Sequence, residues 1–516
     1  MGDTSLAPRT VGIDKFYFKK VDVTWGTFNN NADAAVTLKT KNSILLINEG
    51  NSIVEVSFNG NTVHGELNPS NGTGSLKIDD TSIVKIWFRL KTGKSSIIRI
   101  QNDASINSGF TSTASSPTGS ERSDIDAFGR LRVSNPYTLF ENKQISDNGS
   151  LIWNSTTASG GSTTYSSYRA STKLIVTSTI NSKVIRQTKQ RFSYQSGKSL
   201  LILTTFVMGA GQEGVSKKAG YFDQDNGIFF QNNGNVNSLV IRSSVSGTAD
   251  DNEVNQEDWS IDPMDGYGPS GITLDIEKAQ IFFVDIEWLG VGSVRCGFVI
   301  NGNIYYVHRF DHANIIDSVY MSTPNLPVRY EIQNLSSATG SSLEQICCSV
   351  ISEGGYENQG LSFAIDRGIS SLSGVDNTQL YPLISIRHKL GAYGYQILPQ
   401  FLDVLCTSSN ATFKWALILN PTIAGTDAAS WVDVTGSAVQ YDASRTLLNY
   451  LTGGTTIVSG YGSQKVTTST SLVQGILTLG TTIAGVRDEL VLAVQKVGSG
   501  GSTDEFIGSL NWKEFA

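Results

Sequence analysis

The stretch "SVRCGFVINGNIYYVHRF", residues 293–310, decides the fold class of this chain. Two runs rich in β-branched and aromatic residues flank the dipeptide Asn301-Gly302. Asn-Gly readily adopts the two positive φ values of a type I′ turn, whose twist matches that of paired strands. The stretch therefore predicts two long antiparallel strands joined by a two-residue hairpin turn.

The segment just before it, "FFVDIEWLG" at residues 282–290, alternates with period two. Val284, Ile286 and Trp288 occupy one set of positions, and Asp285 and Glu287 occupy the other. Successive side chains of a strand point to opposite faces of its sheet. We predict a half-buried strand with one apolar face and one acidic face.

Similar runs extend through residues 124–356, and no convincing amphipathic helix interrupts them. About eight or more short strands bounded by turns suit a two-sheet jelly roll. We predict a central lectin-like (concanavalin-type) jelly roll over residues 124–356. Its clearest further strands are expected at residues 173–176, 184–192, 200–208 and 227–230.

Residues 1–106 show the same alternation in "SILLINEGNSIVEVSFNGNTVHGEL". Asn59-Gly60 predicts a second type I′ hairpin there. "TSIVKIWFRLKTGKSSIIRIQ" adds two strands joined by a Lys-Thr-Gly-Lys turn, with Trp87 expected to anchor a small core. We predict an N-terminal β-sandwich that serves as a docking domain.

The remaining chain divides into a linker and a third module. Residues 107–123 are rich in Ser, Thr and Gly, which predicts a linker. Residues 357–516 predict a C-terminal β-sandwich that ends in two strands, 489–497 and 506–514, flanking a flexible hairpin loop at 498–503. The expected fold class is all-β, with tandem β-sandwich domains around the central jelly roll.

The composition limits the classes of partner that the chain is expected to bind. Charged residues make up 16% of the chain, so much of its polar surface comes from Ser, Thr, Asn and 51 Gly. The net charge of −7 offers no basic footprint for nucleic acid. Neutral polar surfaces can be buried against identical neighbours without desolvating charges, which favours a homo-oligomer.

No signal peptide begins the sequence, and no run of 18 or more apolar residues occurs, so we expect neither Sec export nor a membrane span. Four cysteines, of which Cys347 and Cys348 are adjacent, match neither a disulfide framework nor a zinc site. They are interpreted as small buried hydrophobes. No metal or cofactor is predicted.

The most suggestive catalytic pattern lies in the strand at 282–290. It resembles the Glu-x-Asp-x-Glu strand of laminarinase-type jelly-roll glycosidases, in which two glutamates act as nucleophile and acid/base. The matching positions here hold Phe283, Asp285 and Glu287, so the nucleophile is replaced by phenylalanine. We expect no catalytic residues and no enzyme activity; a polysaccharide-degrading enzyme using Asp285 and Glu287 is the least favoured alternative.

Three other motifs have simpler interpretations as turns. Residues 209–214 match GxGxxG but precede no helical pattern, which predicts a loop between strands. Residues 197–199 and 93–95 echo a P-loop ending, but Phe192 and Phe88 stand where its first glycine should be. They too predict turns between strands.

Two sets of polar residues match metal-binding patterns only in part. "DQDNG" at 223–227 lacks the calcium-loop pattern at its fifth and sixth positions and predicts a turn, with surface Ca²⁺ as an open alternative. His308 and His312 suit a metal pair only in part, since no third ligand is evident. We interpret both histidines as polar residues at a strand end.

Aromatic residues of the central domain form the candidate binding site. Sugar rings pack their apolar faces on aromatic side chains, so a lectin-like domain could use such rings to bind glycan; core packing is the alternative role for the same residues. The candidate glycan contacts are Tyr267, Trp288, Tyr305 and Tyr306.

A resemblance bears on the function. "DIDAFGRLRVSNPYTLFENKQ", residues 124–144, resembles a stretch that recurs in virion structural proteins of tailed phages and of some large DNA viruses of algae and amoebae. Residues 397–425 and 488–514 are similar to the C-terminal modules of the same proteins. The resemblance transfers no catalytic residue.

The resemblance implies a capsid-surface, fibre or tail-associated component that assembles in the host cytoplasm with other virion proteins. A carbohydrate-binding adhesion module that contacts host-surface glycan is the main alternative, and it is compatible with a place on the particle.

Overall fold

The computed structural model describes residues 18–23, 35–37, 44–69, 75–78, 85–93, 95–102, 125, 135–336, 339–357, 359–408, 412–463, 468–471, 478–498 and 503–515. These residues form β-strands and turns, with a single 3₁₀ turn at Gln256–Asp258. No helix in this part of the chain is long and apolar enough to cross a bilayer. The predicted all-β class of tandem sandwiches with a central jelly roll is confirmed.

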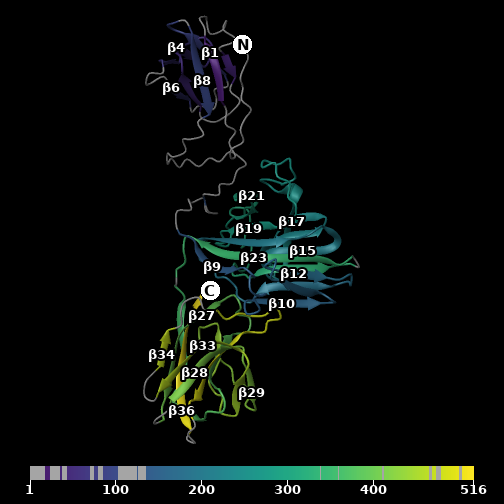
Figure 1. Cartoon of the computed structure of the whole chain (residues 1–516), viewed down its shortest axis with the longest axis vertical. Helices are drawn as coiled ribbons and strands as arrows, with labels where there is room; N and C mark the ends of the chain where they lie inside the picture. The colour runs from purple at the N-terminus through teal and green to yellow at the C-terminus, as the bar shows by residue number, and fades with distance from the viewer. Residues whose placement is uncertain are drawn as a thin grey trace. The chain divides into compact units, whose positions relative to one another are not determined.

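The chain divides into two compact units, Met1–Thr118 and Gly119–Ala516 (Figure 1). The division falls within the predicted linker 107–123, which lies outside the described residues. The other predicted boundaries, at 106/107, 123/124 and 356/357, remain predictions.

The first unit contains two four-stranded sheets. Its core side chains alternate along the strands, as in β7, where Ile86, Phe88 and Leu90 are buried. One sheet consists of β1 (Phe18–Val23), β8 (Ser96–Asn102), β3 (Ile44–Asn48) and β6 (Ser75–Ile78). The other consists of β2 (Ala35–Thr37), β7 (Lys85–Leu90), β4 (Val54–Ser57) and β5 (Gly65–Leu67).

In this unit the prediction for Trp87 is wrong, and the predicted hairpin at Asn59-Gly60 is confirmed by the pairing of β4 with β5 but has another turn type. Trp87 lies on the outer face of β7, where Lys85 Nζ is 5.0 Å from its ring centroid, because its neighbours in the alternation face the core. At Asn59-Gly60 only the glycine has a positive φ, 78°. The Asn59 side chain instead accepts hydrogen bonds from the N–H groups of Asn61 and Thr62 at 2.9 and 3.0 Å, which makes a longer loop than a type I′ turn.

The central part of the second unit is a two-sheet sandwich with one continuous core (Figure 1). The seven-stranded sheet has the order β10 (Trp153–Ala158), β13 (Lys183–Thr188), β22 (Val328–Asn334), β15 (Gln212–Phe222), β16 (Gly227–Gly234), β17 (Val236–Ser243) and β18 (Asp250–Asn255).

The eight-stranded sheet of this sandwich has the order β11 (Ser162–Ser166), β12 (Ser171–Val176), β23 (Ser341–Glu353), β14 (Ser199–Val207), β19 (Gln280–Ile286), β20 (Val294–Ile300) and β21 (Asn303–Phe310), with β9 (Tyr137–Asn142) paired to β23. The predicted hairpin at β20 and β21 is confirmed. Ile300 pairs with Asn303, and Asn301 and Gly302 have φ values of 51° and 79°.

Of the motifs interpreted as turns in this sandwich, residues 197–199 behave as predicted, whereas residues 209–214 do so only in part because 212–214 belong to β15. The GxGxxG string runs directly into β15, a strand, and therefore does not open a helix. At Gly197, with a φ of 85°, the chain turns before β14, and the Lys198 N–H donates to the Gln195 carbonyl at 3.1 Å.

The C-terminal part of the second unit is another sandwich with a core of its own. Its five-stranded sheet contains β24 (Leu361–Asp366), β36 (Asp504–Phe515), β27 (Gln396–Cys406) and β34 (Thr468–Ser471), with β25 (Leu372–Val375) paired to β36. Its six-stranded sheet has the order β30 (Val432–Asp433), β31 (Val439–Asp442), β26 (Tyr381–His388), β35 (Glu489–Lys496), β28 (Thr412–Leu419) and β33 (Thr455–Ser463). A short pair, β29 (Thr422–Gly425) and β32 (Asn449–Thr452), completes it.

The prediction for the last two strands is half right. Both β35 and β36 are strands, as expected, but they do not pair as a hairpin. β35 lies between β26 and β28, and β36 lies in the opposite sheet. Leu492 and Ala493 on β35 are both buried, on opposite faces of the sheet, as is typical of a strand in the interior of a covered sheet.

Candidate functional site

The four aromatic residues predicted to contact glycan do not form one platform. Tyr305 and Tyr306 are neighbours on β21, so their side chains point to opposite faces of the sheet. Tyr305 and Trp288 pack against the core between the two sheets. Tyr306 is buried on the other face, with the Arg295 guanidinium 4.6 Å from its ring centroid. Of the four, Tyr267 alone presents an open ring, being 95% exposed.

The predicted acidic face of β19 is also wrong, because Asp285 is completely buried. Its Oδ2 pairs with Arg295 Nη2 at 2.5 Å, and the same nitrogen donates to the Ile125 carbonyl at 2.9 Å. Phe283 packs edge-on against Tyr306 beside this pair, with ring centroids 5.1 Å apart. Both faces of the strand are therefore covered, and Asp285 is held in an ion pair away from solvent.

The two histidines after the long hairpin occupy separate structural positions. His308 Nδ1 accepts a hydrogen bond from the Ser260 N–H at 3.0 Å, and burial lowers the pKa of His308 to about 4. His312 stacks on Tyr320 with ring centroids 4.1 Å apart, and its Nδ1 lies 2.7 Å from the Gly292 carbonyl oxygen. Across the described residues no group of three or more His, Cys, Asp or Glu side chains is arranged to hold a metal ion.

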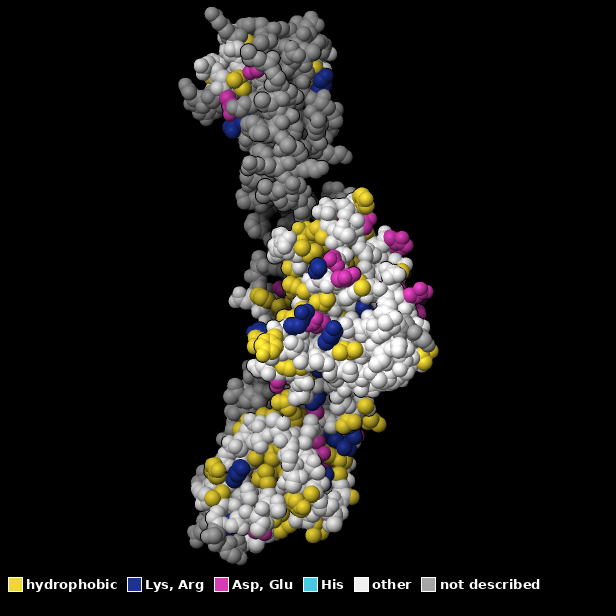
Figure 2. Space-filling view, turned by 45° about the vertical axis from the view of Figure 1, so that its right-hand side comes forward, with side chains coloured by type: hydrophobic (Ala, Val, Ile, Leu, Met, Phe, Trp, Pro, Cys, Tyr) yellow, Lys and Arg dark blue, Asp and Glu magenta, His cyan; other side chains and the backbone are white. Residues whose placement is uncertain are grey.

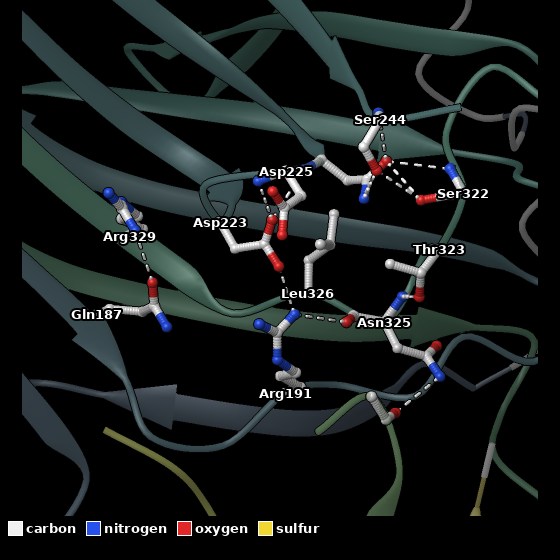
Figure 3. A network of polar contacts seen from close by, with 12 residues as sticks. Gln187, Arg191, Asp223, Asp225, Ser244, Ser322, Thr323, Asn325, Leu326 and Arg329 are labelled. Atoms are coloured by element: carbon white, nitrogen blue, oxygen red, sulfur yellow. Dashed lines mark hydrogen bonds and ion pairs between the residues drawn. The ribbon is translucent and has the colours of Figure 1, made fainter. Parts of the chain in front are cut away.

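The acidic turn between β15 and β16 is a turn, as predicted (Figure 3). Asp223 Oδ1 accepts the N–H groups of Asp225 and Asn226, both at 2.8 Å. Its Oδ2 pairs with the Arg191 guanidinium at 2.7 Å, and Arg191 also donates to the Asn325 carbonyl at 3.4 Å. The arginine supplies the positive charge that stabilises this carboxylate.

The residues that sequence reasoning missed lie on the outer face of the seven-stranded sheet. The register places Lys218 of β15 opposite Glu331 of β22 on one side and Gln231 of β16 on the other. Gln187 of β13 pairs with Arg329 of β22, and both side chains also point outward. Alternate residues of the same strands, such as Ala219 and Tyr330, face the core. The result is a polar grid built from six strands, which we call the central outer face; its members are Lys183, Gln187, Lys218, Gln231, Asn233, Arg242, Asp251, Glu253, Arg329, Glu331 and Gln333.

Ion pairs fix the side chains of the central outer face. Lys183 Nζ lies 2.7 Å from a Glu331 oxygen, and Arg329 Nε donates to the other oxygen at 3.0 Å. Arg242 forms a two-pronged pair with Asp251 at 2.7 and 2.9 Å. Such bidentate pairs give directional rigidity as well as energy. Figure 2 shows basic and acidic side chains next to one another on one face of the second unit, among larger uncharged areas.

Aromatic rings lie beneath the charged groups. Phe222 and Phe229 are fully buried on this outer side of the sheet, with ring centroids 4.4 Å apart. Lys218 and Arg242 approach the Phe229 ring at 5.1 and 5.3 Å from its centroid. Gly220 permits this packing, because a Cβ there would meet the Phe229 Cα at 2.6 Å. The cations are therefore held over π faces, which adds to their positioning.

Burial and neighbouring charges both shift the pKa values of charged groups on the central outer face. Burial alone would raise the pKa of Glu331, but Arg329 and Lys183 outweigh it and lower the pKa to about 2. Burial and the neighbouring Arg242 lower the pKa of Lys218. Such perturbed groups occur both at binding sites and in structural ion-pair networks. In the sequence, the signal was the alternation of Arg329 and Glu331 with apolar residues in "VRYEIQN".

The sequence matches no protein-family model, and no curated protein is similar to it. Among solved structures, the chain is similar to a protein of unknown function from Shewanella oneidensis, with 8% identity and a TM-score of 0.29, covering 47% of this chain and all of the other. It is also similar to the CBM2 module of the Lactobacillus casei BL23 phage J-1 evolved Dit, with 9% identity and a TM-score of 0.30, covering 43% and 98%. A putative β-glucanase from Mycobacterium abscessus has 9% identity and a TM-score of 0.30, covering 42% and 100%. Likenesses this remote carry no argument about activity.

Proposed function

We propose that this chain is a structural component of a virus particle whose central sandwich binds carbohydrate through the central outer face. The observation that carries the carbohydrate part is the grid of planar polar side chains held in place over Phe222 and Phe229. A sugar offers many hydroxyl groups at fixed positions, so a receptor gains affinity when its donors and acceptors are already oriented. Asn233 and Glu253 are exposed, and Lys218, Arg242 and Gln333 are partly exposed, so a ligand can reach them.

The place on a virus particle rests on the resemblance of residues 124–144, 397–425 and 488–514 to virion structural proteins. The largely uncharged surface supports contacts with identical neighbours and with other particle proteins. In this proposal the particle carries several copies, and the central outer face meets host-surface glycan. Neither nucleic acid nor membrane is a partner.

We also propose that binding is not followed by turnover. The only pattern that resembles a catalytic strand has Phe283 in place of the nucleophile. Its central carboxylate, Asp285, is buried against Arg295. A group in that position is out of reach of a glycosidic bond.

A glycan array probed with the full chain tests carbohydrate binding. The informative variant is Lys218→Gln, which removes the cation over Phe229 while leaving the core face of β15 unchanged. The matched control is Lys173→Gln, at an exposed position of β12 in the opposite sheet. We expect the array signal to fall in the first variant and to stay in the second. No signal from the unmodified chain on any glycan would refute carbohydrate binding and leave the grid as a protein contact.

The place on the particle needs a separate measurement. Mass spectrometry of purified virus particles should recover this chain in a fixed ratio to the other particle proteins. Its absence from particles, together with its presence in infected-cell lysate, would contradict the structural role whatever the glycan array shows.

A further inference from the structure

The outer face of the six-stranded sheet in the C-terminal sandwich carries a second row of polar residues. Asp433 of β30 pairs with Gln440 of β31, Gln440 pairs with Arg387 of β26, and Arg387 pairs with Glu489 of β35. Ile386, Val439 and Leu490, which lie next to Arg387, Gln440 and Glu489 along their strands, belong to the core. The four polar side chains therefore share the face that points away from the core.

Two guanidinium groups converge on one neutral oxygen in this row. Arg387 Nε donates to Gln440 Oε1 at 3.2 Å, and Arg487 Nη1 donates to the same oxygen at 3.0 Å. The Gln440 amide nitrogen donates to Asp433 at 2.8 Å, which fixes the orientation of the amide. An amide oxygen brings the two cations together without neutralising either of them.

Both arginines are held in place by further contacts. The Arg387 guanidinium carbon lies 3.7 Å from the centroid of the Trp431 ring, so the two planes are in contact. Arg487 Nη1 also donates to the His388 carbonyl at 3.1 Å. Arginines fixed in this way lose little conformational entropy when an anion binds.

Glu489 and Asp442 act electrostatically on Arg387 without direct contact to its guanidinium group. Within the described ranges no carboxylate forms an ion pair with Arg387 or Arg487 at 4.0 Å or less. Burial lowers the pKa of Arg387, and the repulsion from Arg487 adds to the effect. Burial raises the pKa of Glu489, the cross-strand neighbour of Arg387, against the opposing effects of Arg445 and Arg387. Two arginines without a directly bonded carboxylate thus lie beside an aromatic ring in a chain with a net charge of −7.

We propose that Arg387 and Arg487 bind the carboxylate of an acidic sugar residue, with Trp431 beside them to contact the sugar ring. Guanidinium forks match a carboxylate in geometry and charge, and both arginines retain N–H groups beyond those bound to Gln440 and His388. The choice of a sugar as the carrier of the carboxylate rests on the proposed function. The site itself is separate from the central outer face and lies wholly within the C-terminal sandwich.

The test is titration calorimetry of the full chain with two oligosaccharides that differ only in their terminal residue, glucuronate or glucose. We expect the glucuronate form to bind at least tenfold more tightly. Arg487→Gln and Arg387→Lys should each remove this preference, the second because a lysine keeps the charge but lacks the fork. Lys414→Gln is the matched control, since it removes a cation from the same outer face in β28. Equal melting temperatures establish that the variants are folded.

Several results would overturn the proposal. The unmodified chain could show no preference for glucuronate, or Arg387→Lys and Arg487→Gln could both retain it. Sodium sulfate at matched ionic strength could displace the glucuronate oligosaccharide as well as free glucuronate does, which would make the pair a general anion site. Loss of neutral-glycan binding in Lys218→Gln is independent of all these outcomes. If Arg387 and Arg487 prove not to bind glucuronate, the proposed glycan binding by the central outer face is unaffected, and the reverse also holds.

Discussion

Asp285 and Arg295 face each other across β19 and β20, with 2.5 Å between Oδ2 and Nη2, and both side chains are buried. Replacing Asp285 with Asn leaves the guanidinium in the interior without its counter-charge. We expect a loss of about 3–5 kcal/mol in the free energy of unfolding, measured by urea denaturation. A loss below about 1 kcal/mol would mean that water reaches Arg295 in the folded protein.

The control for that measurement is the exposed pair Arg309–Asp311, whose atoms are 2.9 Å apart and whose side chains are 45% and 47% exposed. Asp311→Asn should change stability by no more than about 0.5 kcal/mol. The Asp285 substitution should also leave glycan binding intact at temperatures where the variant is folded. Loss of glycan binding by the folded variant would support a catalytic or binding role for β19.

The lowered pKa of Glu331 predicts that the central sandwich loses stability in acid. Its pKa is lowered from 4.5 to about 2 by Arg329 and Lys183 against the opposing effect of burial. The folded state therefore binds this proton less tightly than the unfolded state, so the contribution is complete above pH 4.5 and is lost as the pH falls toward 2. The contribution is about 3 kcal/mol by linkage. We expect Glu331→Gln to flatten the fall in stability between pH 5 and 2, measured by urea midpoints; an unchanged slope would contradict this.

The lowered pKa of Lys217 predicts a second rise of stability with pH, this one at alkaline pH. The residue is buried, its Nζ donates to the carbonyls of Met208 and Ala210 at 2.6 and 2.9 Å, and burial lowers its pKa to about 8. Between pH 8 and 10 the unfolded chain binds a proton that the folded chain has released, so stability should rise with pH in this window. Lys217→Met should remove the rise, and Lys173→Met, at an exposed position, should preserve it. A flat profile in the unmodified protein would show that Lys217 stays charged.

The Asn301-Gly302 turn gives a test of backbone strain alone. Gly302 has a φ of 79°, and a Cβ added there would meet nothing within 4 Å. Gly302→Ala should therefore cost about 1–2 kcal/mol from the left-handed backbone and nothing from crowding. Gly394 is equally open but has no left-handed φ, so Gly394→Ala should be neutral or slightly stabilising. Equal effects of the two substitutions would refute the argument from φ.

Local patterns predicted the strands well because alternation and turn chemistry act over a few residues. The hairpin at Asn301-Gly302 follows from two residues that both accept a positive φ. Asn59-Gly60 carries the same letters, but the Asn59 side chain closes a longer loop through its own hydrogen bonds. The dipeptide therefore indicates a reversal of the chain without determining its type.

The binding surfaces could not be predicted because they depend on register between distant strands. The central outer face needs β13, β22, β15, β16, β17 and β18 side by side, and no sequence pattern orders them. Similarly, Arg387 and Arg487 meet only because β26 lies between β31 and β35. Asp285 was misjudged for a related reason: the covering of its face by Arg295 and Ile125 comes from segments outside its own strand.

The position of β22 and β23 has a consequence for how the protein is made. Each pairs with strands that precede it by a long stretch of chain, β22 with β13 and β15, and β23 with β12, β14 and β9. A ribosome must therefore translate almost the whole central region before either sheet can close, and until then β13, β14 and β15 have open hydrogen-bonding edges. Folding with such distant pairings is slow, so newly made chains pass through a period in which they can aggregate or need a chaperone.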